Sequence, residues 1–244
     1  SKEQLLTTID DLGRATLVLN RPERHNAFDD SLIAELTAVL KNLAADPKVR
    51  VVCLTGAGKS FSAGADLEWM RRMADYSEAE NLADSLALAE LMQTLDNLPK
   101  PTLALVQGAA FGGGVGLVAA CDLVLATPET KFCLSEVKLG LIPAVISPYV
   151  IAAIGARAAR RYFIRAERFD AKRARQLGLV HKVVDAEDLA KEADRLTRLL
   201  LKNGPQAMAM AKKLVAEVSQ RPLDAALIAE TANQIARVRS SDEG

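Results

Sequence analysis

The sequence has few of the residues that mark a disulfide framework or a metal centre. It contains three cysteines and two histidines, and aromatic residues make up 4% of the chain. Cys53, Cys121 and Cys133 are odd in number and lie in apolar stretches, so we expect reduced, buried thiols in a cytoplasmic protein. His25 and His181 belong to no serine or cysteine nucleophile pattern, and we expect both to be structural.

The chain also lacks an excess of either charge. Lys and Arg together number 31, as do Asp and Glu, so no overall positive field would attract nucleic acid or an anionic membrane. No apolar run has transmembrane length, no signal-peptide pattern is present, and no metal-ligand spacing occurs. The glycine run at 112–116 lacks the acidic ribose partner of a dinucleotide site. Half of the residues are hydrophobic, which is enough for a sizeable core.

Hydrophobic periodicity predicts an α/β protein in which strands and helices alternate. The predicted strands are 5–10, 14–20, 49–55, 102–106, 122–126 and 179–184. The predicted helices are 32–43, 66–73, 78–98, 115–121, 187–202, 205–218 and 222–237, and the chain is mostly helical after Pro143. This alternation predicts a mainly parallel sheet built from repeated ββα-like units.

Two strand–loop–helix units carry the strongest functional signal. One loop is 59–70 (KSFSAGADLEWM), and the other contains the glycine run Gly112–Gly114. Glycine lets the backbone approach a ligand, and a helix N-terminus offers unpaired N–H groups with positive partial charge. Two such units can present two N–H groups to one oxygen that becomes negative. Each loop alone could equally be a packing turn, with Asp66 as a helix cap.

One carboxylate follows in a largely apolar setting. Glu136 lies between Phe132 and Leu141, and it could be either a solvated surface group or an acid/base.

Together these segments resemble the crotonase (enoyl-CoA hydratase/isomerase) superfamily. The resemblance rests on NRPERHNAF at 20–28, SFSAGADL at 60–67 and VQGAAFGGG at 106–114, with support from SEVKLGLIP at 135–143. It covers nearly the whole chain. It implies a crotonase-like spiral of ββα units over 1–185 and a C-terminal helical region over 186–244, assembled as homotrimers or homohexamers. Family members carry a further helical segment, so we expect this region, and any lid it forms, to be incomplete.

The resemblance also implies the ligand and the roles of individual residues. The ligand is an acyl-CoA thioester; because coenzyme A is part of the substrate, no separate cofactor, metal, membrane or nucleic-acid partner is expected. The thioester oxygen would lie between the N–H groups of Ala65 and Gly113, with Glu136 as the acid/base. The implied substrate-binding residues are Ala63, Gly64, Asp66, Gly112, Gly116 and Arg24. Arg21, Arg71 and Arg72 could also meet coenzyme A phosphates, or be ordinary solvated charges.

Two positions depart from the usual family pattern. Gly116 stands where the usual hydratase has a second glutamate, and 143–149 (PAVISPY) replaces a glycine-rich loop. Glycine inside a helix costs roughly 1 kcal/mol relative to alanine, so we expect Gly116 to make room for something. The bulkier loop would narrow the acyl end of the pocket. The pairing of 115–122 with 135–149 is most similar to bacterial methylglutaconyl-CoA hydratases of leucine and acyclic-terpene breakdown.

The resulting hypotheses differ in chemistry. The leading one is a lyase that adds water to an α,β-unsaturated acyl-CoA. A single carboxylate also suits a Δ3-Δ2-enoyl-CoA isomerase, which moves one proton between two carbons. The third is a catalytically silent CoA-thioester binder or an RNA-binding relative, and the balanced charge argues against RNA.

Overall fold

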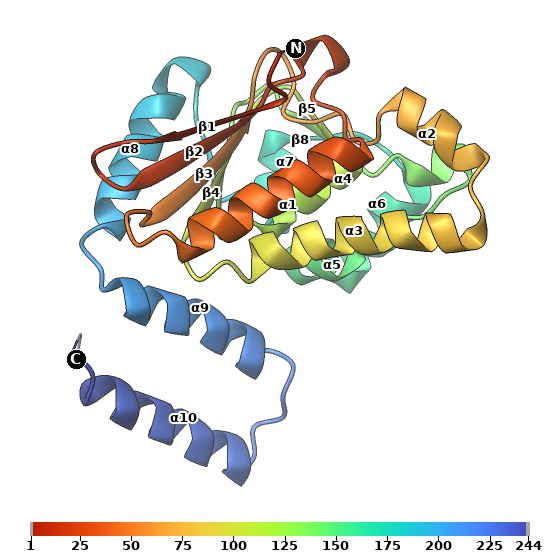
Figure 1. The fold of residues 1–244 in the computed structure, drawn as a ribbon. Helices are drawn as coiled ribbons and strands as arrows, with labels where there is room; N and C mark the ends of the chain where they lie inside the picture. Colours follow the sequence, from red (N-terminus) through yellow and green to blue (C-terminus); the bar gives the residue numbers. More distant parts are fainter. Residues whose placement is uncertain (1, 243–244) are drawn as a thin grey trace.

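The computed structural model describes residues 2–242, which form two β-sheets flanked by helices (Figure 1). The large sheet has the strand order β1-β2-β3-β4-β6-β9, in which β1 and β2 are antiparallel and the other neighbours are parallel. Its strands are β1 (Leu5–Ile9), β2 (Arg14–Leu19), β3 (Val51–Gly56), β4 (Thr102–Val106), β6 (Leu123–Ala126) and β9 (Lys182–Val183). The small sheet consists of β5 (Ala109–Phe111), β7 (Lys131–Cys133) and β8 (Phe169–Asp170).

Helices cover both faces of the large sheet. Helices α1 (Asp30–Ala45) and α3 (Glu78–Asp96) pack together on one face, and α8 (Leu189–Leu200) covers the other (Figure 1). The remaining helices are α2 (Leu67–Ala74), α4 (Gly113–Ala120), α5 (Ser147–Ile154), α6 (Ala156–Arg165), α7 (Ala171–Leu177), α9 (Pro205–Val218) and α10 (Ala225–Arg239). None of the helices in residues 2–242 combines the length and apolarity that crossing a membrane requires.

The chain repeats one unit as it winds through the two sheets. Strand β4 of the large sheet leads to β5 of the small sheet and then to α4; β6 likewise leads to β7 and then to a 3₁₀ turn, η2 (Glu136–Leu139). After β3, the N–H groups of Phe61 and Ser62 donate to the carbonyl of Ala109 at 3.0 Å, so this segment also joins the small-sheet layer before α2 begins. The predicted α/β spiral is therefore confirmed.

The register of the small layer brings three turns of the spiral to one edge. Phe111 lies opposite Cys133, and the N–H of Gly112 donates to the Cys133 carbonyl at 2.8 Å. On the other side, the N–H of Phe111 donates to the Ser62 carbonyl at 2.9 Å. The residues that follow β5, β7 and the segment 61–62 therefore meet at the same place, although they are far apart in sequence.

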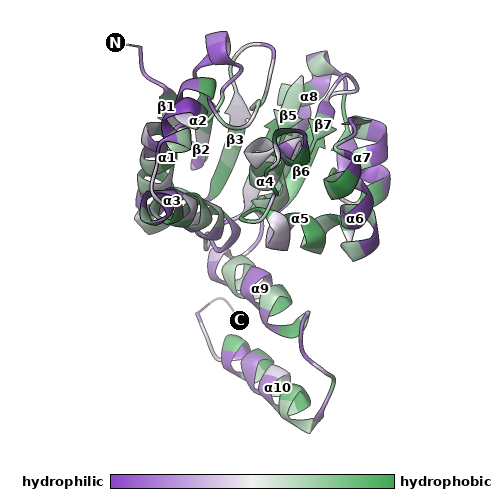
Figure 2. Ribbon diagram, turned by 90° about the vertical axis from the view of Figure 1, so that its right-hand side faces the viewer, coloured by the Kyte–Doolittle hydropathy of each residue, from purple (hydrophilic) through white to green (hydrophobic). Residues whose placement is uncertain are grey.

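Helices α9 and α10 form an arm that projects from the body in two perpendicular views (Figures 1 and 2). Lys212 of α9 ties the arm to the body, since its Nζ lies 2.9 Å from Asp122 Oδ2. Helix α8, in contrast, packs against β4 and β6 of the large sheet. The part of the chain that leaves the body thus starts at α9, and the proposed domain boundary at 185/186 stays a prediction.

Other local expectations had mixed outcomes. The three cysteines are buried and free, as predicted, and burial raises the pKa of Cys53 to about 11 and that of Cys121 to about 12. The strand predicted at 179–184 is only Lys182–Val183. The small sheet was not predicted, because strands of two or three residues are too short to show an alternating pattern.

Candidate active site

The two glycine-rich loops lie directly against each other. Gly64 has φ +91° and Gly112 has φ +53°, a region that favours glycine. A Cβ added at Gly64 would lie 3.1 Å from the Phe111 carbonyl oxygen, and one added at Gly112 would lie 3.9 Å from Gly64 Cα. The positive φ therefore favours glycine at both positions, and the close approach of the two loops is a second reason at Gly64.

One backbone N–H in the first loop has no acceptor. Phe28 forms a parallel bridge with Ala65, in which the Phe28 N–H donates to the Gly64 carbonyl and the Asp66 N–H donates to the Phe28 carbonyl, both at 2.6 Å. The bridge uses the residues on either side of Ala65, so the N–H of Ala65 itself stays unpaired within the described chain. Ala65 is exposed, and this N–H is available to a ligand.

A second free N–H comes from the start of α4. Gly113 is the first helical residue, and the carbonyl of Gly112 is used by the N–H groups of Val115 at 2.9 Å and Gly116 at 3.3 Å. The N–H of Gly113 has no partner among residues 2–242, as expected in a first helical turn. A Cβ at Gly113 would lie 2.6 Å from Phe28 Cε2, so the Phe28 ring packs directly on this helix start.

Glu136 faces the same place from the next turn of the spiral. Its Oε2 lies 3.6 Å from the point where a Cβ of Gly112 would be, so the missing side chain leaves this space open. Its Oε1 is buried without a hydrogen-bond partner. Burial raises the pKa of Glu136, and no neighbouring charge contributes to that shift. A lone, partly desolvated carboxylate therefore lies beside two adjacent loops that each offer a free N–H.

Asp66 stabilises the first loop through hydrogen bonds of its side chain. It caps α2, with Oδ1 accepting from the N–H groups of Glu68 at 2.9 Å and Trp69 at 3.2 Å. Its Oδ2 accepts from Arg21 at 3.1 Å and Arg24 at 3.0 Å. Burial raises the pKa of Asp66, but the hydrogen bonds from Arg24, Trp69 and Glu68 and the charge of Arg21 outweigh it, so the pKa lies below its usual value. The capping role expected for Asp66 is present.

The arginines near this loop differ in exposure. Arg21 is buried, whereas the exposed Arg24 also pairs with Glu68 at 3.1 Å. Arg72 pairs with Asp30 at 2.9 Å. The suggestion that Arg21 meets a phosphate is wrong, because its guanidinium is buried against Asp29 and Asp66. The Arg24 side chain is 42% exposed, and its contact with a ligand phosphate stays a prediction.

Arg21→Ala is expected to destabilise the fold by roughly 3–5 kcal/mol, because removing one partner of a buried ion pair leaves a buried charge unpaired. Arg21 contacts Asp66 and Asp29 through its guanidinium and donates to the Ala27 carbonyl at 3.0 Å. Urea unfolding measures the loss, with the exposed Arg24→Ala as the matched control for a much smaller effect. Equal losses in the two variants would contradict the structural role given to Arg21.

Ala63 and the two histidines also form hydrogen bonds within the fold. The Ala63 N–H donates to the His25 carbonyl at 2.9 Å, and His25 Nδ1 lies 2.9 Å from Ser60 Oγ. His181 Nδ1 accepts from the Val124 N–H at 3.0 Å. Both histidines therefore have structural contacts, as predicted.

The space beside Gly116 is filled. A Cβ added there would lie 2.9 Å from Ile146 Cβ and 3.1 Å from Met92 Cε, and closer still to Ile146 Cγ2. Ile146 belongs to the unusual loop 143–149, so the two departures from the family pattern meet in space. A glutamate at position 116 would have to displace Ile146. Direct contact between Gly116 and a substrate stays a prediction.

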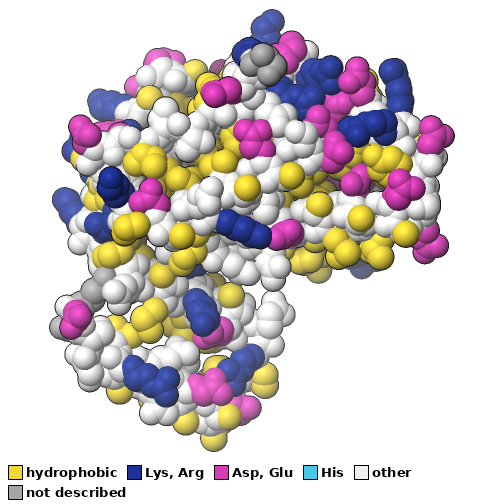
Figure 3. Space-filling view, in the orientation of Figure 1, with side chains coloured by type: hydrophobic (Ala, Val, Ile, Leu, Met, Phe, Trp, Pro, Cys, Tyr) yellow, Lys and Arg dark blue, Asp and Glu magenta, His cyan; other side chains and the backbone are white. Residues whose placement is uncertain are grey.

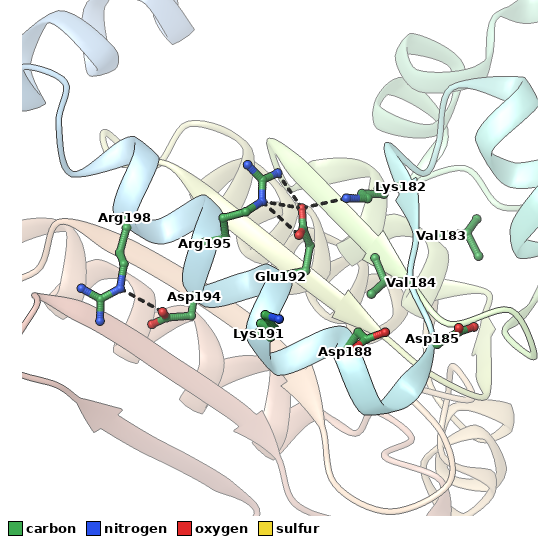
Figure 4. Close-up of a pocket in the computed structure, with 10 residues that line it drawn as sticks. All are labelled: Lys182, Val183, Val184, Asp185, Asp188, Lys191, Glu192, Asp194, Arg195 and Arg198. Atoms are coloured by element: carbon green, nitrogen blue, oxygen red, sulfur yellow. Dashed lines mark hydrogen bonds and ion pairs between the residues drawn. The ribbon is translucent and has the colours of Figure 1, made fainter.

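A charged hollow of about 690 Å³ lies elsewhere, between β9 and α8 (Figure 4). Glu192 binds Lys182 at 3.2 Å and Arg195 at 2.7 Å, and Asp194 binds Arg198 at 2.9 Å. Four bases and four acids line it, so opposite charges compensate and the hollow is a poor anion site. Its lining residues are Lys182, Val183, Val184, Asp185, Asp188, Lys191, Glu192, Asp194, Arg195 and Arg198.

Comparisons with known proteins identify the family to which this chain belongs. The sequence profile described as "Enoyl-CoA hydratase/isomerase" matches residues 13–244. The chain belongs to the enoyl-CoA hydratase/isomerase family. A crystal structure of an enoyl-CoA hydratase from Shewanella pealeana is 48% identical, with a TM-score of 0.96 over 99% of this chain and 90% of that one.

Curated relatives in this family carry different activities in their names. A 1,2-epoxyphenylacetyl-CoA isomerase from Escherichia coli K12 is 34% identical over 94% of this chain and 88% of its own length. A short-chain-enoyl-CoA hydratase from Clostridium acetobutylicum is 31% identical over 89% of this chain and 83% of its own length. The predicted resemblance to the crotonase superfamily is confirmed, and the general class is hydratase/isomerase.

Sequence reasoning missed three supports of the site in this family member. Asn26 has φ +55°, and its side chain accepts from the Arg21 N–H at 2.8 Å and donates to the Ser60 carbonyl at 2.8 Å. Ser62 Oγ donates to the Asn26 carbonyl at 2.9 Å. The packing of Ile146 on Gly116 was also missed. Only Asn26 carried a signal, since asparagine tolerates a left-handed conformation.

Proposed function

We propose that this chain is a carbon–oxygen lyase that adds water to an α,β-unsaturated acyl-CoA. The observation that carries the proposal is the lone, partly buried Glu136 carboxylate beside two loops with free N–H groups, at Ala65 and Gly113. The N–H pair would hold the thioester oxygen where negative charge develops, which stabilises the transition state more than the ground state.

The proposed chemistry uses one carboxylate twice. Ionised Glu136 takes a proton from water while the water oxygen bonds to the β carbon. The electron pair of the carbon–carbon double bond moves to the thioester oxygen, and the N–H groups of Ala65 and Gly113 bind this enolate. Protonated Glu136 then gives its proton to the α carbon, so the carboxylate returns to its starting state.

An isomerase is the second candidate, and the isolation of Glu136 favours it. No other carboxylate influences its pKa, and position 116 offers none. In the Δ3-Δ2-enoyl-CoA isomerase reaction Glu136 would take a proton from the α carbon and return it to the γ carbon, with the same enolate bound to the N–H pair.

Mass measurement in deuterated water separates the two reactions. Incubation with a 2-enoyl-CoA thioester is expected to give a product heavier by one water molecule, and a 3-enoyl-CoA thioester, which has no α,β double bond, is expected to stay unchanged. Deuterium uptake with movement of the double bond and no added water would favour the isomerase instead. If neither change occurs with any short or branched thioester, the protein is a binder and the proposed reaction is wrong.

The substrate we favour is methylglutaconyl-CoA, which carries a terminal carboxylate. Positive charge on the Glu136 side supports it: the charges of Lys138 and Arg168 act on the Cys133 thiol next to Glu136, and Arg168 lies 5.1 Å from the centre of the Phe111 ring. Neither cation forms an ion pair within residues 2–242. One of them could bind the substrate's carboxylate.

We expect kcat/KM to be at least about tenfold higher for methylglutaconyl-CoA than for crotonyl-CoA, since a hydrogen bond to a charged group contributes about 1.5–3 kcal/mol. Lys138→Gln and Arg168→Gln, measured separately, should show which cation supplies the preference. Equal kcat/KM values for the two thioesters would contradict this substrate assignment.

The remaining contacts and the assembly are also proposals. Coenzyme A would lie along the loop that contains Ala63, Gly64 and Asp66, with Arg24 at the rim near its phosphates. We propose a homotrimer or homohexamer, because the arm exposes large apolar side chains that a second copy could cover (Figure 3). These are Met210, Leu214, Val215, Leu223, Ile228 and Ile235. Light scattering tests the assembly.

A further inference from the structure

The contact between Gly116 and Ile146 joins the helix that starts at Gly113 to the segment that starts at Glu136. Gly116 is buried one turn into α4, and Ile146, which is 3% exposed, directly precedes α5. The absence of a side chain at Gly116 lets Ile146 reach the helix backbone, while Met92 of α3 closes the same space. Ile146 is β-branched, so its side chain has few alternative positions.

The segment from Glu136 to Ile146 is held at its beginning, where the turn η2 also lies against α6, and at its end. Its internal hydrogen bonds are short-range: the Leu141 N–H donates to the Glu136 carbonyl at 3.1 Å, and the Ala144 N–H donates to the Ile142 carbonyl at 2.9 Å. The side chains in its middle point to solvent, with Ile142 73% exposed. Strand β7 fixes the beginning of the segment, and the buried Pro143 and Ile146 fix its end.

We propose that Gly116 and Ile146 are a positioning pair, whose contact sets the place of the 136–146 segment and so the distance from the Glu136 carboxylate to the N–H of Gly113. The Ile146 side chain also occupies the position beside α4 from which a second carboxylate could reach the substrate. This inference rests on the proposed function of Glu136. It explains why the glycine and the bulky loop occur together.

The consequence for catalysis follows from geometry. A methyl group at position 116 would push Ile146 away, and the push would be transmitted along the chain toward Glu136. A misplacement of about 1 Å at a reacting group can cost on the order of a hundredfold in rate. The 63–66 loop, along which we propose that coenzyme A lies, is not part of the 136–146 segment, so substrate affinity should be affected less than turnover.

The test changes the size of the side chain at each of the two positions, singly and together. Gly116→Ala and Ile146→Ala are each expected to lower kcat by about 10–100-fold while KM changes by less than about threefold. The double variant, in which the alanine methyl at 116 partly fills the space left by Ile146, is expected to recover at least about fivefold over Gly116→Ala.

Val150→Ala is the matched control. Val150 is fully buried on α5, one turn after Ile146, and lies outside the 136–146 segment. Its truncation should lower the melting temperature about as much as Ile146→Ala, through the cavity that it creates, and leave kcat within about twofold of wild type. If the Gly116 and Ile146 variants lose only stability, as this control does, or if their effects on kcat simply add, the positioning role is wrong.

A readout that does not need turnover separates this inference from the proposed function. NMR titration of the Glu136 carboxyl should show its pKa falling toward the usual value in Ile146→Ala, because water enters, and staying raised in Val150→Ala. The charges of Lys138, Arg168 and Glu136 act on the nearby Cys133 thiol, and all three proteins keep these four groups. Wild type that turns over no thioester would refute the proposed function; an unchanged titration in Ile146→Ala would refute the pair.

Discussion

Glu136→Gln is expected to lower kcat by about 10²–10⁴-fold, the usual contribution of a positioned acid/base, with binding of the thioester nearly unchanged. The amide keeps the size of the carboxyl group but can neither take nor return a proton. Steady-state kinetics and calorimetric binding measure the two effects. Wild-type kcat in this variant would show that Glu136 is not the acid/base.

The same variant should be more stable than wild type at neutral pH. Burial raises the pKa of Glu136, so the folded protein holds this proton more tightly than the unfolded chain does. Stability therefore falls as the pH rises from the usual carboxyl range through the raised pKa, and glutamine removes that loss. Melting temperatures at about pH 8 should favour Glu136→Gln, and the difference should shrink at about pH 4.

Glu129→Gln is the matched control for both measurements. Glu129 is exposed in the turn between β6 and β7, with no ion pair in the described part of the chain. Its substitution should change neither kcat nor the pH dependence of the melting temperature. A gain in stability at high pH that is equal in the two variants would mean that net charge, and not the burial of Glu136, is the cause.

Ala65→Pro is expected to lower kcat by about 10²–10³-fold, because proline has no N–H and the enolate would lose one of its two donors. The change should leave the fold intact. The bridge to Phe28 uses the Gly64 carbonyl and the Asp66 N–H, and both remain. Gly64 has no Cβ to clash with the proline ring.

Ala65→Ser is the comparison, since it keeps the N–H at an exposed position and should lose far less activity than the proline variant. Circular dichroism and binding of a saturated acyl-CoA check that Ala65→Pro is folded. A proline variant that is folded and as active as the serine variant would contradict the role of this N–H.

The sequence was most informative where glycine and carboxylate patterns report backbone geometry. The loop 59–70, the run Gly112–Gly114 and Glu136 could be singled out because a glycine loop before a helix and an acid in an apolar run each have a direct physical meaning. The α/β alternation followed from hydrophobic periodicity. Ala65 came only from the family resemblance, since a backbone donor leaves no trace in its own side chain.

Other features depend on packing between distant segments and could not be predicted. Arginine usually lies at the surface, yet Arg21 is buried because Asp29 and Asp66 both form ion pairs with it. Gly116 was expected to make room for something, but the sequence could not show that Ile146, 30 positions later, fills this space. Propensity and periodicity describe neighbours along the chain, so partners of this kind become visible only in three dimensions.

The bridge between Phe28 and Ala65 has a consequence for how this loop can vary. Alternation along an extended segment determines which N–H groups the bridge uses and which one stays free, and this does not depend on the side chain at that position. Substitutions at residue 65 that keep the N–H should thus be tolerated during evolution. Insertion or deletion of one residue between Ser62 and Asp66 would turn the donor away and expose a carbonyl oxygen, which repels an enolate. The length of this loop should therefore be under stronger selection than its composition.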